Sequence, residues 1–136
     1  MMNNSQAETA IFTKLKAFTG VSNANLRYEN QPLKNGQAYV PPINESWCKV
    51  SIQYADSQMV GMAETPCIRD SGIINIQCFT PKNKGTLTMT ALCDAWRAFL
   101  QNYNFEHLEI YLVHAPASID DDDFLAKIIR AEFRVN

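Results

Sequence analysis

Apolar residues near the start of the chain recur at helical spacing, every three or four positions. Between residues 6 and 18 they are Ala7, Ala10, Ile11, Leu15 and Phe18. This period predicts an amphipathic helix. Ser5 can cap its start, Glu8 can complete a capping box and Gly20 can end it. The polar residues 1–5 are expected to form a flexible tail.

A second helical period and several β-type stretches predict the remaining elements. Residues 86–103 carry an apolar stripe at helical spacing. Strands are predicted where apolar and polar residues alternate or β-prone residues gather, at 26–30, 47–54, 72–79 and 107–116. The last segment, 124–135, fits both a strand and a helix, because periodicity alone does not separate the two.

The order of these elements predicts the fold class. The strand at 72–79, the helix at 86–103 and the strand at 107–116 form a β–α–β unit, which joins parallel strands when they share a sheet. We therefore predict an α+β fold in a single domain over residues 1–136. It has a mixed, mostly antiparallel sheet with two helices packed on one face.

Two apolar features do not fit this predicted core. Residues 55–70 show no clean period, although Met59, Val60 and Met62 are apolar. So long a loop in a small domain is usually functional or interfacial, and a loop folded back onto its own core is the alternative. Trp47 lies on the polar face of its strand, where a bulky aromatic is either covered by a loop or part of a contact surface.

Composition narrows the functional classes. The 136 residues are 46% hydrophobic, which is enough to form a core, and 12 basic against 14 acidic residues give a net charge of −2. This balance argues against nucleic-acid binding, which needs a basic surface, and against a membrane-surface role. No apolar run is long enough to cross a membrane, and the N-terminus lacks a signal-peptide pattern.

The cysteines and the sequence motifs give no sign of a cofactor. Cys48, Cys67, Cys78 and Cys93 have neither CxxC nor zinc-site spacing. The first, third and fourth fall in apolar patterns, which favours buried, reduced thiols in a protein made in a cytoplasm. A disulfide framework is the alternative. Neither of the glycine-rich nucleotide-binding motifs occurs in the chain.

A run of four carboxylates at 120–123 is the strongest candidate for chemistry. A calcium loop counted from Asp120 would need ligands at positions 5 and 12 and glycine at position 6, and all three are missing. Contiguous residues of an extended chain point to alternate sides, so they cannot all face one ion. The run then predicts a solvated loop. A metal-dependent hydrolase that combines it with His107 or His114 is the alternative.

Several stretches, taken in order, carry a family resemblance. They are YENQP at 28–32, WCKVSI at 47–52, SGIINIQCFTPKNKGT at 71–86 running into TALCDAWRAFL, and finally LEIYLVHAP and FLAKIIRAEFRVN. Their order and spacing resemble the small tail terminator (tail completion) proteins of long-tailed phages, of the lambda type. The resemblance covers about residues 7–135, and the proline-rich stretch 33–45 departs from the family pattern.

The resemblance implies a role in the virion, at the junction of tail and neck, after synthesis in the cytoplasm of a bacterial host. Such proteins assemble as hexameric rings on the tube of the major tail protein, stop its growth and join the head-completion or neck protein. DNA passes through the ring without specific binding, and there is no catalysis and no cofactor. The resemblance also implies that 124–135 is a closing strand, which we adopt. A head–tail connector or a host-side binding module is the alternative.

A ring requires two different patches on each subunit that meet head to tail. We expect the subunit or tube interface at Trp47, Met59, Val60, Met62 and Arg69. The acidic residues are Asp120, Asp121, Asp122 and Asp123. Repeated around a ring, they would form a negative band that repels DNA phosphates in the lumen or meets a basic patch on the neck partner.

Overall fold

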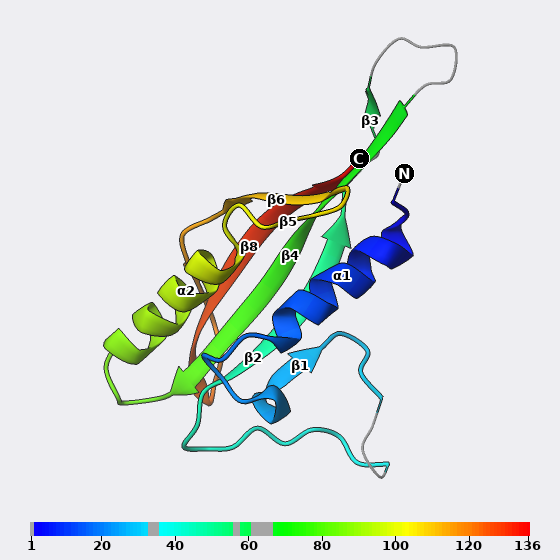
Figure 1. Cartoon of the computed structure of the whole chain (residues 1–136). Coiled ribbons are helices and arrows are strands. Elements are labelled where there is room, and N and C mark those ends of the chain that lie inside the picture. The colour runs from blue at the N-terminus through cyan, green and yellow to red at the C-terminus, as the bar shows by residue number, and fades with distance from the viewer. Residues whose placement is uncertain (1, 33–35, 56–57, 61–66) are drawn as a thin grey trace.

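The chain forms one sheet with two helices on one of its faces (Figure 1). The computed structural model describes residues 2–32, 36–55, 58–60 and 67–136. The elements in this part are α1 (Asn4–Lys16), the 3₁₀ turn η1 (Asn23–Asn25), β1 (Leu26–Tyr28), β2 (Trp47–Tyr54), β3 (Gln58–Val60), β4 (Cys67–Pro81), α2 (Leu87–Leu100), β5 (Asn104–Phe105), β6 (Leu108–Val113), β7 (Ala117–Ile119) and β8 (Phe124–Val135). The predicted α+β class is confirmed.

The first helix begins earlier than its apolar period predicted. Asn3, not Ser5, is the N-cap, and it forms a capping box with Gln6 rather than with Glu8. The Asn3 side chain accepts from the Gln6 N–H at 2.8 Å, and the Gln6 side chain accepts from the Asn3 N–H at 2.9 Å. Part of the expected flexible tail is therefore the cap and first turn of α1, which ends at Lys16, before Gly20.

The described strands are ordered β1-β2-β4-β8-β6-β5, with β3 also paired to β4 and β7 to β8. Every pair is antiparallel except β1 with β2. Because β4 and β6 both run antiparallel to β8 between them, they are parallel to each other. The predicted β–α–β unit is thus present with a strand inserted at its centre. That strand is residues 124–135, as adopted from the resemblance.

The core lies between the helices and the sheet face that they cover. Its largest fully buried side chains include Trp96, Ile11, Leu15, Met89, Ile74, Ile76, Ile129 and Phe133. Trp96 stacks on Phe18 with ring centroids 3.6 Å apart. Among the described helices, none is long and apolar enough to span a membrane.

Two parts of the predicted loop 55–70 are strands, at 58–60 and 67–70. Strand β4 already begins at Cys67, and β3 pairs with it so that Gln58 lies opposite Arg69. We call β3 and the facing part of β4 (67–69) the arm. Figure 1 shows the arm extending past the end of the sheet. No helix covers it there, and this explains why its sequence lacks the alternation of a half-buried strand.

Candidate interaction surfaces

Trp47, one of the expected interface residues, is half-buried in an aromatic cluster. Its ring stacks on Phe79, with centroids 4.1 Å apart and planes 10° apart, and Phe124 meets it edge-on at 5.9 Å. Tyr39, from the connection between β1 and β2, lies 5.7 Å away. Trp47 Nε1 is buried and has no hydrogen-bond partner in the described part of the chain. The ring thus packs against aromatic residues from β4, β8 and the β1–β2 connection, and its place in a subunit or tube interface stays a prediction.

This aromatic cluster lies on the sheet face opposite the helices. Trp47 faces Phe79 across β2 and β4, next to the pair Cys48 and Cys78, which belongs to the main core. Neighbouring residues of a strand point to opposite faces. The cluster is therefore a second, small core at the end of the sheet where β8 begins.

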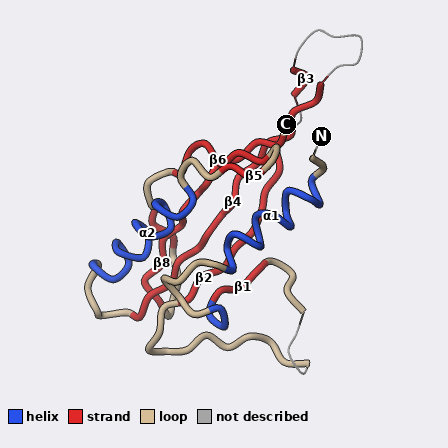
Figure 2. Tube along the Cα trace, in the orientation of Figure 1, coloured by secondary structure: helices blue, strands red, loops and turns tan. Residues whose placement is uncertain are grey.

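The connection between β1 and β2 holds a feature that sequence reasoning missed. We call residues 39–45 the strap, and Figure 2 shows it within the long loop between these strands. Asn25 holds the strap at both ends. Its Oδ1 accepts from Tyr39 Oη at 3.3 Å, and its Nδ2 donates to Glu45 Oε2 at 3.0 Å. The Arg27 guanidinium lies 4.4 Å above the Tyr39 ring.

The anchored strap holds two large apolar side chains in water. Val40 is 82% exposed and Ile43 is 81% exposed. Between them stand Pro41 and Pro42, which fix their own φ angles and favour an extended chain before each proline. Single exposed apolar residues are ordinary, but these two are presented together by a fixed segment. The sequence signal was the Val-Pro-Pro-Ile tetrad, which turn propensity alone read as a loop.

The acidic run forms the loop between β7 and β8, and its four side chains are exposed. Asp121 Oδ2 accepts from the N–H groups of Asp123 at 3.0 Å and Phe124 at 2.9 Å, which builds an Asx-type turn. The Lys82 ammonium donates to the carbonyl oxygen of Asp122. One carboxylate therefore shapes the turn. Among the described residues, no group of three or more His, Cys, Asp or Glu is placed to hold a metal ion.

The structure does not bring either histidine to the acidic run. His114 Nε2 lies 2.7 Å from Glu132 Oε2, and Glu132 is eight residues along β8 from Phe124, roughly 26 Å in an extended strand. The carbonyl of His107 accepts from the N–H of Asn136 at 2.9 Å, beyond the far end of β8. The site expected of a hydrolase is not assembled by these residues.

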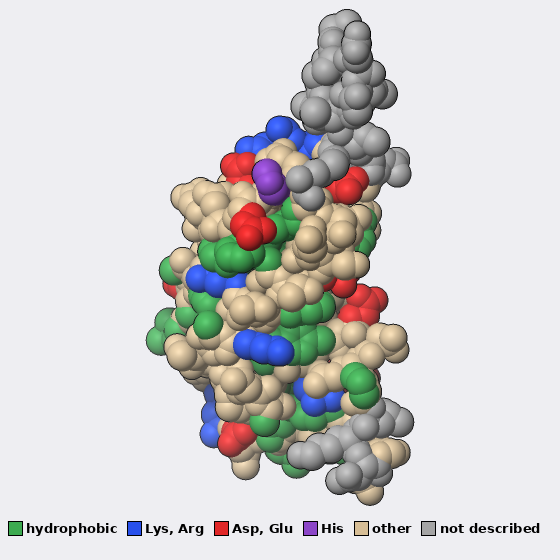
Figure 3. Space-filling model, turned by 45° about the vertical axis from the view of Figure 1, so that its right-hand side comes forward, with side chains coloured by type: hydrophobic (Ala, Val, Ile, Leu, Met, Phe, Trp, Pro, Cys, Tyr) green, Lys and Arg blue, Asp and Glu red, His purple; other side chains and the backbone are tan. Residues whose placement is uncertain are grey.

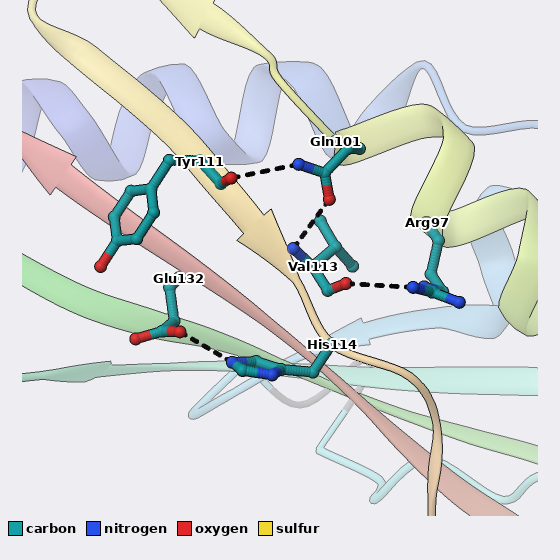
Figure 4. A network of polar contacts seen from close by, with 6 residues as sticks. All are labelled: Arg97, Gln101, Tyr111, Val113, His114 and Glu132. Atoms are coloured by element: carbon teal, nitrogen blue, oxygen red, sulfur yellow. Dashed lines mark hydrogen bonds and ion pairs between the residues drawn. The ribbon is translucent and has the colours of Figure 1, made fainter.

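The outer edge of β6 is closed at its bulge by Gln101, the C-cap residue of α2 (Figure 4). Strand β6 has a bulge between Ile110 and Leu112. Beside it, Gln101 Nε2 donates to the Tyr111 carbonyl at 3.1 Å, and Gln101 Oε1 accepts from the Val113 N–H at 2.9 Å. The side-chain amide thus replaces a neighbouring strand, and this edge is not free to pair with another chain.

A charged cluster lies at the end of the sheet near the arm. Arg134 forms a two-pronged ion pair with Glu109, at 2.7 and 2.9 Å, and its guanidinium lies 4.6 Å above the Tyr111 ring. The hydrogen bonds from Arg134 lower the pKa of Glu109. Arg69, an expected interface residue, donates from Nε to Asn136 Oδ1 at 2.6 Å. Arg69 thus ties the base of the arm to the C-terminal residue.

Two further expected interface residues lie on the arm. Met59 and Val60 belong to β3, where they pair with Ile68 and Cys67. Met62 lies outside the described residues. The structure therefore places Met59, Val60 and Arg69 on the arm, whereas Trp47, at the start of β2, pairs with Phe79 near the other end of β4.

Three of the cysteines, Cys48, Cys78 and Cys93, are free thiols in the main core. Cys48, Cys78 and Cys93 are fully buried. Hydrogen bonds to the other two thiols, together with burial, raise the pKa of Cys78 well above its usual range. This thiol stays protonated and is a poor nucleophile. The expected role of these residues as small buried hydrophobes is confirmed.

A groove of about 440 Å³ lies between α1 and the segment around β5. We call it the α1–β5 groove, and its walls include Met2, Thr9, Ala10, Thr13, Tyr103 and Phe105. Met2 and Ala10 are buried in its floor, whereas Phe105 is 46% exposed. On the face seen in Figure 3, hydrophobic side chains lie in separate patches among polar ones. A partner that binds this face would therefore meet separate apolar patches and not one continuous apolar surface.

Comparison with known proteins supports the fold alone. No protein-family model matches the chain, and no curated protein matches it. One solved structure, of a protein whose name states no function, is similar with a TM-score of 0.66 at 12% identity. The match covers 100% of this chain and 97% of that one. The likeness extends the α+β architecture over the whole length.

Proposed function

We propose that the protein is a structural virion protein, a tail terminator that forms a ring on the end of a phage tail tube. In this role it ends tube polymerisation and offers the surface that joins the tail to the head. The order of the sequence motifs supports the proposal. So does the finding that residues 124–135 form a strand, β8, as the resemblance implied.

The observation that carries the proposal is the arm. A two-stranded hairpin without further cover is marginally stable in water, and the arm extends past the sheet without a helix over it (Figure 1). A neighbouring subunit or the tail tube would supply the missing cover. The acidic loop lies at the opposite end of β4, where Pro81 pairs with Phe124. A subunit with two such different ends suits a position between two partners, tube and neck.

Electron microscopy of the purified protein, alone and mixed with tubes of the major tail protein, tests the proposal. We expect closed rings and tubes of constant length with a cap at one end. The substitution Met59→Asp places a charge on the arm and is expected to weaken capping. Gln53→Asp, at an exposed position of β2, is the matched control.

A protein that stays monomeric at high concentration and leaves tube ends uncapped would contradict the proposal. Rings that bind neck components but not tubes would instead indicate the connector role.

A further inference from the structure

We infer that the strap binds a second copy of this chain, with Val40 and Ile43 of one copy seated in the α1–β5 groove of the next. The biological role of this contact, joining neighbours in a ring, rests on the proposed function. The contact itself is inferred from the geometry of the strap and of the α1–β5 groove.

The strap is built to present its apolar side chains. Asn25 bonds to Tyr39 at one end and to Glu45 at the other, so the segment between them is short and held in place. Two prolines restrict that segment further. A fixed segment loses little conformational freedom on binding. Val40 and Ile43 are thus held in an exposed position before a partner binds.

The groove has the chemistry that such a segment requires. Its volume lies in the range of ligand-binding clefts, and aromatic rings form one wall. Grooves lined by aromatic residues bind extended, proline-containing segments. The Tyr103 carbonyl accepts from the Ile110 N–H at 2.8 Å, and the Lys14 ammonium lies 4.6 Å above the Tyr103 ring. This wall is therefore fixed before anything binds.

Charge also favours this pairing. The strap has no charged residue between Tyr39 and Glu45, and Glu45 is already bonded to Asn25. Glu106 is the single charged residue among those that line the groove in the described structure. Docking would bury no strap charge, so the contact should depend little on salt.

The two surfaces lie on different parts of the molecule. The strap lies near the start of β2, whereas the groove lies beside the first turns of α1 and β5, toward the arm end (Figure 1). A contact between two different patches is heterologous and propagates from copy to copy. Such a contact closes into a ring when the rotation per subunit permits, as the proposed function needs.

Sedimentation equilibrium of the full chain tests the contact. The double substitution Val40→Ser and Ile43→Ser should weaken self-association at least tenfold. Leu87→Ser, which changes another apolar residue that is 83% exposed, should leave association unchanged. Equal association of the double variant and the wild type, or an equal loss in the Leu87 variant, would overturn the inference.

A mixing experiment identifies the partner surface. Phe105→Ser damages the groove and leaves the strap intact, while the strap double variant keeps the groove. Each variant alone should be monomeric, and a mixture should form one-to-one dimers through the remaining strap and groove. A mixture that stays monomeric, with both variants folded by circular dichroism, would overturn the inference.

These experiments also distinguish failure of the strap contact from failure of the tail-terminator proposal. Rings that persist in the strap double variant would refute the strap contact and leave the tail-terminator proposal standing. One-to-one dimers in the mixture, with no rings or capped tubes from the wild type, would support the strap contact and refute the tail-terminator proposal.

Discussion

Gly72 shows how closely single residues fit at the arm end of the sheet. A Cβ at this position would lie 2.5 Å from the Gln53 carbonyl oxygen and 2.8 Å from Cζ of Phe133. Both neighbours are held in place, the first as strand backbone and the second as a fully buried ring. Gly72→Ala should therefore lower the free energy of unfolding by about 2 kcal/mol, as overpacked core sites do.

Urea unfolding of Gly72→Ala beside Ser71→Ala tests this expectation. Ser71 directly precedes Gly72 on β4, and its side chain lies on the opposite face of the strand. The Ser71 variant should stay within about 0.5 kcal/mol of the wild type, as surface substitutions usually do. Equal stability of the two variants would mean that the packing around Gly72 is looser than described.

The ion pair of Glu109 and Arg134 predicts a pH dependence with a definite sign. The Arg134 hydrogen bonds lower the pKa of Glu109 in the folded state. A lowered carboxyl pKa stabilises the fold above the unfolded pKa, about 4.3, and this stabilisation is lost as pH falls through the folded value. Glu109→Gln should thus be less stable than the wild type at pH 7, and the difference should shrink below about pH 4.

Thermal unfolding of both proteins between pH 7 and pH 3 measures this difference. Glu106→Gln, at an exposed carboxylate in the preceding turn, controls for a general loss of negative charge. A gap between Glu109→Gln and the wild type that stays constant with pH would rule out the ion pair as its cause.

Individual residues were predictable from the sequence where burial decides their place. The alternating apolar positions of β4, β8 and the first half of β2 are buried as expected, because a half-covered sheet imposes a period of two, whereas the end of β2 is exposed. Trp47 broke that period, and its partners Phe79 and Phe124 come from other strands. Val40 and Ile43 carry no period at all. Their exposure follows from the anchoring by Asn25, a contact between distant residues that no local pattern encodes.

For the helices and strands, the type of each element was easier to predict from the sequence than its first and last residues. The N-cap of α1 lies two residues before the predicted one, because Asn3 and Gln6 can form a capping box as well as Ser5 and Glu8 can. Strand β4 is 15 residues long, but only its middle part has the alternation of a strand with one covered face. Residues 124–135 fit both periods, and pairing with β4 and β6 on either side decides for the strand.

The β6 edge depends on the side chain of Gln101, the C-cap residue of α2. Gln101 bonds to both the Tyr111 carbonyl and the Val113 N–H beside the bulge. Gln101→Met removes both bonds and keeps a similar length, so it should lower the free energy of unfolding by about 1 kcal/mol. The Val113 amide should also exchange its hydrogen faster, which NMR measures directly.

The matched control is Gln53→Met, at an exposed position of β2. It should change neither stability nor the exchange rate of Val113. Unchanged protection of Val113 in the Gln101 variant would show that the bond to Gln101 Oε1 is not what shields this amide.

At the scale of the whole molecule, the long sheet separates surfaces of different character. The arm and the pair Glu109–Arg134 lie at one end, and the aromatic cluster, the strap and the acidic loop lie toward the other. The helices cover one face only (Figure 1). Composition could not reveal this separation, because a net charge of −2 does not say where along the sheet the charged residues lie.

The acidic loop gives the last prediction, which concerns the whole assembly. Replacing Asp120 to Asp123 by Asn removes four of the 14 acidic groups, so that the 12 basic groups then outnumber the acidic ones. The fold should survive, because an Asn at position 121 can still accept from the N–H groups of Asp123 and Phe124. If the loop repels DNA phosphates from the proposed ring, the variant should bind double-stranded DNA at low salt and release it as salt rises.

Fluorescence anisotropy of a labelled DNA duplex measures this binding. Asp94→Asn, on the exposed side of α2, is the control for the loss of one charge. Equal DNA binding by the wild type and the variant would remove the repulsive role and leave contact with a basic partner as the function of the loop.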